Sequence, residues 1–83
     1  MDKTVSKKIE IFILNKLKLK NKRYLLLKKK TNLFNQGIDS IDFFSLIFDV
    51  ENKYKIKIKE KMYLKLNTIE KLINFIKKNT NIS

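Results

Sequence analysis

The stretch Leu33-Phe34-Asn35-Gln36-Gly37-Ile38-Asp39-Ser40-Ile41 marks the point where a loop turns into a helix. Gly37 supplies the backbone freedom that a tight turn needs. Asp39 can cap a helix, and Asp42 three residues later approximates a capping box. The pattern therefore predicts a helix that begins at Ser40 or beside it, with the serine hydroxyl in its first turn.

The helix predicted after this loop, over residues 40–53, has two apolar stripes. One stripe, expected in the core, follows the i, i+3, i+4, i+7, i+11 spacing of a single helical face: Phe43, Leu46, Ile47, Val50 and Tyr54. The second stripe places Phe44 and Phe48 on the same side as Ser40. Surface aromatics are a common recognition device, but a helix that is apolar nearly all round can also simply be buried.

The rest of the chain predicts an all-α fold in one domain, residues 1–83, because no linker or internal repeat interrupts it. We expect a helix over 4–17 with Thr4 as its N-cap, a short helical turn over 60–65, and a last helix over 68–78 after the capping signature Asn67-Thr68-Ile69-Glu70. The first helix should bury one apolar face: Val5, Ile9, Phe12, Ile13 and Leu17.

Two segments have weaker patterns. Residues Lys18 to Lys30 are interpreted as a long connection, in which Leu25-Leu26-Leu27 could form a helical turn, a short strand or a loop placed on the core. Residues 53–59 alternate like a half-buried strand, yet no partner strand is evident. We therefore expect an extended loop that buries Ile56 or Ile58.

Length and composition argue against an enzyme. The chain has 83 residues and contains neither Cys nor His, so disulfides, thiolate nucleophiles, the usual zinc ligand sets and the commonest general base are absent from it. We expect no catalytic residues and no metal site. No signal-peptide pattern is present near the start, which predicts a cytoplasmic location; we also expect a monomer.

The charge of the chain is strongly positive, with 20 Lys and Arg against 8 Asp and Glu and a formal net charge of +12. One interpretation is a small basic helical protein that binds nucleic acid or an anionic membrane. However, 19 of the basic residues are Lys, whereas Arg is favoured for bidentate phosphate recognition. Residues with A/T-rich codons are in excess throughout, so genome composition explains much of the lysine, and we expect neither nucleic acid nor membrane as partner.

The window from Thr31 to Asn52 contains no Lys or Arg but four acidic residues: Asp39, Asp42, Asp49 and Glu51. The first two lie at a predicted helix start, where acids complement the macrodipole. The other two lie near the far end, where that explanation does not apply. We therefore expect this surface to meet positively charged partners.

The order and spacing of these elements resemble the acyl and peptidyl carrier protein family. Leu33-Phe34-x-x-Gly37-Ile38-Asp39-Ser40-Ile41 is similar to the family's attachment loop. Further positions resemble its core and helix starts: Leu46, Val50 and Tyr54 in the second helix, Ile58 after it, and Asn67-Thr68-Ile69 before the last helix. The resemblance implies a bundle of three main helices with one short helix and a long first loop.

The resemblance also implies a function. A separate phosphopantetheinyl transferase would move 4′-phosphopantetheine from coenzyme A onto Ser40, and the thiol of the arm would then hold an acyl or aminoacyl group as a thioester. Asp39 would help to hold magnesium and coenzyme A phosphates in the transferase complex. Loading and processing enzymes of fatty acid or of specialised, polyketide-type or nonribosomal-type biosynthesis would read a partner surface: Ile41, Asp42, Phe44, Phe48, Asp49 and Glu51.

The chain departs from the family pattern in ways that bear on its partners. Carriers of fatty acid synthesis are usually acidic, whereas this chain is basic, and Ser45 and Asn52 occupy two positions that are often acidic in the family. Ile41 replaces the commoner Leu, Gln36 lies where many members have Leu, and Lys59 replaces a frequent Pro. The attachment chemistry is untouched by these differences, but generic recognition by fatty acid synthases is in doubt.

Overall fold

The computed structural model describes residues 2–24 and 26–80 of the chain. Its elements are α1 (Asp2–Lys20), the 3₁₀ turn η1 (Phe34–Gln36), α2 (Ser40–Tyr54), the 3₁₀ helix η2 (Glu60–Lys65) and α3 (Ile69–Asn79). The described residues contain no strand. The predicted all-α fold with three main helices, one short helix and a long first loop is therefore confirmed.

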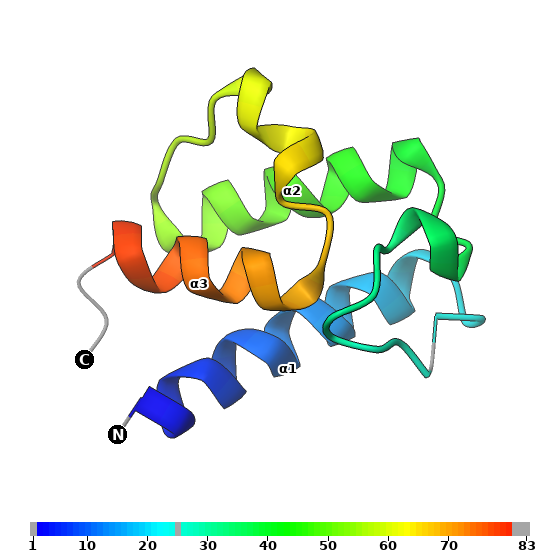
Figure 1. Cartoon of the computed structure of the whole chain (residues 1–83), viewed down its shortest axis with the longest axis horizontal. Helices are drawn as coiled ribbons and strands as arrows, with labels where there is room; N and C mark the ends of the chain where they lie inside the picture. The colour runs from blue at the N-terminus through cyan, green and yellow to red at the C-terminus, as the bar shows by residue number, and fades with distance from the viewer. Residues whose placement is uncertain (1, 25, 81–83) are drawn as a thin grey trace.

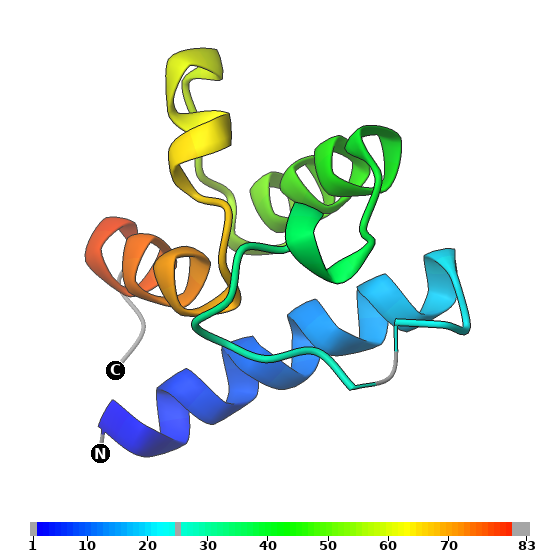
Figure 2. The same cartoon turned by 45° about the vertical axis from the view of Figure 1, so that its right-hand side comes forward.

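The three α-helices enclose one core. α1 packs against both α2 and α3, and η2 lies on the far side of these two helices from α1 (Figures 1 and 2). The inward stripes of the helices supply most of the buried side chains, and the connecting loops add Tyr24, Leu33, Ile38, Ile58 and Leu66. The stripes predicted for α1 and α2 are buried in large part: Ile9, Ile13, Leu17, Phe43, Leu46, Ile47 and Val50 are in the core, and Val5, Phe12 and Tyr54 are half-buried against it.

Helix α1 is longer at both ends than predicted. It begins at Asp2, so Thr4 lies inside the helix and its prediction as the N-cap is wrong. Adding residues to a helix already held by tertiary packing costs little, because nucleation is the expensive step. At the other end the helix continues to Lys20, whose ammonium group contacts Asp49 of α2 at 2.6 Å. The connection to α2 is correspondingly shorter than Lys18–Lys30 suggested.

The connection between α1 and α2 is held by hydrogen bonds to the start of α3. The amide of Leu33 donates to the carbonyl oxygen of Asn67 at 2.8 Å. The amide of Glu70 donates to the carbonyl oxygen of Lys29 at 3.0 Å. Within this stretch Leu26 is 93% exposed and Leu27 packs half-buried on the core, whereas the predictions for Leu25 lie outside the described residues. The loop before Ser40 is therefore anchored to the start of α3.

The segment before η2 is a loop, and the segment after it leads into a capped helix, as the sequence predicted. Residues 56–59 form no helix, and Ile58 is buried, as expected for an extended loop. The N-cap of α3 is Thr68, whose hydroxyl oxygen accepts from the amide of Lys71 at 3.0 Å. Because Thr68 caps the helix in place of Asn67, Glu70 lies one position earlier in the helix than the capping signature predicted, and α3 begins at Ile69.

No helix in the described part of the chain is both long enough and apolar enough to cross a membrane. Among residues 2–24 and 26–80 there is likewise no group of three or more acidic, His or Cys side chains that could hold a metal ion.

Candidate functional site

The first turn of α2 presents Ser40 at the surface. Gly37 ends η1 with a φ of 93°, a left-handed conformation that glycine adopts without steric cost. The next residue, Ile38, is buried and fixes the chain to the core. Asp39 then caps the helix, because its Oδ1 accepts from the amide of Asp42 at 2.8 Å. Ser40 follows as the first residue of the helix, and its side chain is exposed.

Asp42 does not complete the capping box with its own carboxylate. Its Oδ2 instead accepts a hydrogen bond from the hydroxyl of Tyr24 at 2.8 Å. Burial raises the pKa of Tyr24, and the hydrogen bond to Asp42 raises this pKa further. Tyr24 thus joins the α1–α2 loop to the start of α2. Sequence reasoning missed it, since a single tyrosine in a lysine-rich stretch has no neighbour that predicts this contact.

Gln36 is a second residue whose role the sequence did not show. Its side-chain amide accepts from the backbone amide of Lys28 at 2.6 Å and donates to the carbonyl oxygens of Lys28 and Thr31 at 3.0 and 2.9 Å. These bonds close the loop on itself just before the turn at Gly37. The side chain of Gln36 thus fixes the loop through hydrogen bonds to its backbone.

Within residues 2–24 and 26–80, no side chain that could act as a base is hydrogen-bonded to Ser40. The chain has no His, and none of the hydrogen bonds found in the described residues reaches the Ser40 hydroxyl. The first amides of a helix lack intrahelical acceptors, and the helix dipole places positive potential at this end. The hydroxyl can therefore be modified from outside, and an anionic group attached to it would lie in a favourable field.

Beside Ser40, α2 exposes three large apolar side chains. Ile41 is 79% exposed, Phe44 45% and Phe48 65%; we call these three residues the outer face of α2. The ring of Phe44 lies 5.8 Å from that of Tyr63 in η2, centroid to centroid. Leu64 of η2 is also exposed, so this helix adds apolar surface that sequence reasoning did not include.

The acidic residues predicted for the same surface each have a partner within the chain. Asp49 binds the ammonium group of Lys20 at 2.6 Å, on the α1 side of α2. Glu51 accepts from the amide of Ile58 at 2.8 Å, on the side of the following loop. The structure thus brings Ser40 and Ile41 together at the start of α2, but places Asp49 and Glu51 on opposite flanks of the helix.

Comparisons with known proteins agree with this geometry. A family model described as "Phosphopantetheine attachment site" matches residues 16–76, which include Ser40. The chain is 30% identical over 76 residues to proteins named "Acyl carrier protein" from Buchnera aphidicola subsp. Acyrthosiphon pisum strains Tuc7 and APS, covering 92% of each chain. It is 30% identical over 74 residues to the protein of that name from strain 5A, covering 89% of this chain and 90% of the relative.

The residues at the start of α2 fit the group that this match implies. A 4′-phosphopantetheine arm is joined to its carrier through a phosphodiester, and the formation of this bond needs a hydroxyl that is accessible from outside. Ser40 is exposed at the positive end of α2, and the carboxylates close to it in sequence, Asp39 and Asp42, accept hydrogen bonds from an amide and from Tyr24. The chain belongs to the phosphopantetheine-attachment family, whose covalent prosthetic group is 4′-phosphopantetheine.

Proposed function

We propose that Ser40 is the attachment point of the phosphopantetheine arm and that the chain carries an acyl intermediate as a thioester on it. The observation that supports this most directly is the exposed serine hydroxyl in the first turn of α2, within the matched region. The phosphate would face the N-terminal amides of the helix. The arm extends the reach of the cargo, while the chain itself performs no catalysis.

The relatives favour an acyl group over an aminoacyl group, because they are named acyl carrier proteins. We propose fatty acid biosynthesis as the first pathway to test, with specialised biosynthesis as the alternative. The partners would be a phosphopantetheinyl transferase and the enzymes that load and process the acyl group. The cytoplasmic location, the monomeric state and the single domain over residues 1–83 stay predictions.

We propose that partner enzymes contact the outer face of α2 next to Ser40. Ile41, Phe44 and Phe48 are exposed although they are large and apolar, and such surface is characteristic of protein contacts. Asp42, Asp49 and Glu51 would border this face. That these carboxylates speed the encounter with positively charged partners stays a prediction. Asp39 would cap α2 and would also help to hold magnesium and the coenzyme A phosphates in the transferase complex.

The test is enzymatic loading of the purified chain. Incubation with a broad-specificity phosphopantetheinyl transferase, coenzyme A and magnesium should add the mass of one phosphopantetheine to the intact protein. Ser40→Ala should abolish the addition, whereas Ser45→Ala, which removes another exposed hydroxyl on the same helix, should leave it unchanged. A wild-type chain that several such transferases leave unmodified, or a Ser40→Ala chain that is still modified, would contradict the proposal.

A further inference from the structure

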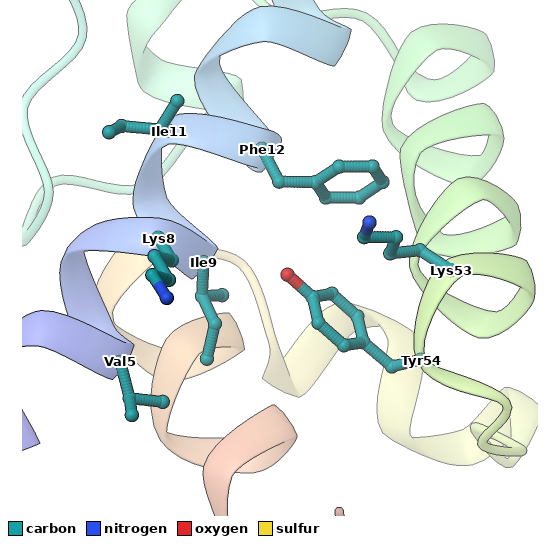
Figure 3. A pocket seen from close by; sticks show the side chains of 7 residues that line it. All are labelled: Val5, Lys8, Ile9, Ile11, Phe12, Lys53 and Tyr54. Atoms are coloured by element: carbon teal, nitrogen blue, oxygen red, sulfur yellow. The ribbon is translucent and has the colours of Figure 1, made fainter. Parts of the chain in front are cut away.

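A pocket of about 380 Å³ lies at the end of α2 that is remote from Ser40. Its apolar walls come from Val5, Ile9, Ile11 and Phe12 of the first half of α1 and from Tyr54 in the last turn of α2 (Figure 3). The volume falls within the roughly 300–1,000 Å³ that small-molecule sites usually have. Because α2 has 15 residues at about 1.5 Å per residue, the pocket is about 20 Å from the serine along the helix axis.

The walls are held by contacts within the core. The rings of Phe12 and Tyr54 meet edge to face, with centroids 5.6 Å apart and planes at 81°. Ile9 is fully buried beneath them, while Ile11 is 47% exposed at the edge. An apolar chain bound in this pocket would remove hydrocarbon surface of the chain and of the pocket walls from water.

The polar groups at this pocket are cations and one hydroxyl. Lys8 and Lys53 line it, and the ammonium nitrogen of Lys53 is 5.8 Å from the centroid of the Phe12 ring. Figure 3 shows the Tyr54 hydroxyl directed toward α1, and no hydrogen bond to it is found among the described residues. Among the side chains that the structure describes, those lining the pocket include no carboxylate.

Two acids on these helices, Asp49 and Glu10, are bound to other lysines. Asp49 contacts Lys20 at 2.6 Å, and Glu10 contacts Lys7 at 3.9 Å and Lys29 at 3.7 Å. The pocket therefore combines apolar walls with donors and positive charge. This combination complements a molecule that has an apolar tail and a negatively charged head, and it disfavours a cationic head on the same tail.

We propose that this pocket binds the anion of a free medium-chain carboxylic acid. The hydrocarbon tail would lie against Ile9, Phe12 and Tyr54, and the carboxylate would lie between the ammonium groups of Lys8 and Lys53. The ligand is a free acid and not the cargo on Ser40, because an acyl group held as a thioester has no carboxylate that could pair with Lys8 and Lys53. The proposal does not depend on the loading of the serine.

The test uses the Ser40→Ala chain, so that no arm can be attached. Uniformly ¹⁵N-labelled protein is titrated with decanoate and, in parallel, with decyltrimethylammonium, which has the same tail and the opposite charge. Decanoate should shift the amide signals of residues 5–12 and 53–55 in a saturable way and bind at least several-fold more tightly than the ammonium compound. Equal affinities, no saturable shift, or shifts centred on Phe44 and Phe48 would overturn the proposal.

Variants locate the head and the tail of the ligand. Lys53→Gln and Lys8→Gln should each weaken decanoate binding about two- to fivefold, the range expected for one exposed ion pair. Lys18→Gln removes an exposed lysine of α1 that does not line the pocket and should leave the affinity unchanged. Ile11→Ser should weaken binding without loss of helical signal in circular dichroism. Equal losses in Lys53→Gln and Lys18→Gln would mean attraction by net charge alone and would contradict the proposed site.

Discussion

The inner and outer faces of α2 are similar in amino-acid type and opposite in environment. The inner face, made of Phe43, Leu46, Ile47 and Val50, is at most 1% exposed, whereas the outer face of Ile41, Phe44 and Phe48 is 45–79% exposed. The inner face is covered by neighbouring elements of the fold, and its burial contributes to stability. The outer face gains little from folding, and we propose that its apolar side chains serve contacts with other molecules.

The largest expected difference in stability is between alanine variants of two adjacent phenylalanines, one on each face of α2. Phe43→Ala should lower the free energy of unfolding by about 3–5 kcal/mol, because it leaves a cavity beside Phe34, whose ring centroid is 5.0 Å away. Phe44→Ala should cost less than about 1 kcal/mol, since that ring is half exposed. Urea unfolding followed by circular dichroism measures both values.

A second inner-face variant keeps this comparison measurable when Phe43→Ala is largely unfolded. Phe43→Leu retains most of the side-chain volume and should lose clearly less stability than Phe43→Ala. Equal losses for the Phe43→Ala and Phe44→Ala chains would mean that the two faces of α2 do not differ in their contribution to the fold.

The next effect concerns Tyr24 and its hydrogen bond to Asp42. Tyr24→Phe should lower the free energy of unfolding by about 1–2 kcal/mol near neutral pH, because a bond to a charged acceptor is lost. Burial raises the pKa of Tyr24, so the folded chain keeps the phenol proton at a pH where the unfolded chain releases it. The contribution of Tyr24 is therefore complete below about pH 10, the ordinary tyrosine pKa, and is lost as the pH rises through the folded-state pKa.

The measurement is the difference in unfolding free energy between the wild type and Tyr24→Phe from pH 8 to pH 11. This difference should shrink above about pH 10. Tyr54→Phe is the matched control for the hydrogen bond: burial also raises the pKa of Tyr54, so its gap should shrink above about pH 10 as well, but no carboxylate accepts its hydroxyl proton among the described residues, so its loss near neutral pH should be smaller than that of Tyr24→Phe. A gap for Tyr24→Phe that is constant over this range would show that its ionisation is not coupled to folding.

The smallest expected effect distinguishes two roles of Asp39 at the start of α2. Asp39→Ala should destabilise the chain by about 1 kcal/mol through loss of the N-cap, whereas Asp39→Asn, which also caps well, should change stability by only a few tenths of a kcal/mol. If the carboxylate also acts in the transferase complex, Asp39→Asn should be loaded more slowly than the wild type although it is equally stable. Equal loading rates would leave only the capping role.

The helices and the position of Ser40 followed from local patterns that sequence alone contains. The i, i+3, i+4 spacing of apolar residues predicted which faces of α1 and α2 would be buried, since a helix has 3.6 residues per turn wherever it packs. Asp39 followed by Asp42 predicted the start of α2, because an N-cap bonds an amide only three residues away. These are short-range relations, and they placed an exposed serine in the first turn of the helix.

Contacts between residues that are apart in the sequence decided which groups the carboxylates bind. The bond from Tyr24 to Asp42, the ion pair of Lys20 with Asp49, and the bond from the amide of Ile58 to Glu51 join residues that are 18, 29 and 7 positions apart. A sequence pattern shows that a carboxylate is present but not which donor will reach it after the helices pack. For that reason the acidic window could be identified from the sequence, whereas the internal partners of its carboxylates, and the apolar pocket between α1 and the end of α2, depend on the tertiary structure.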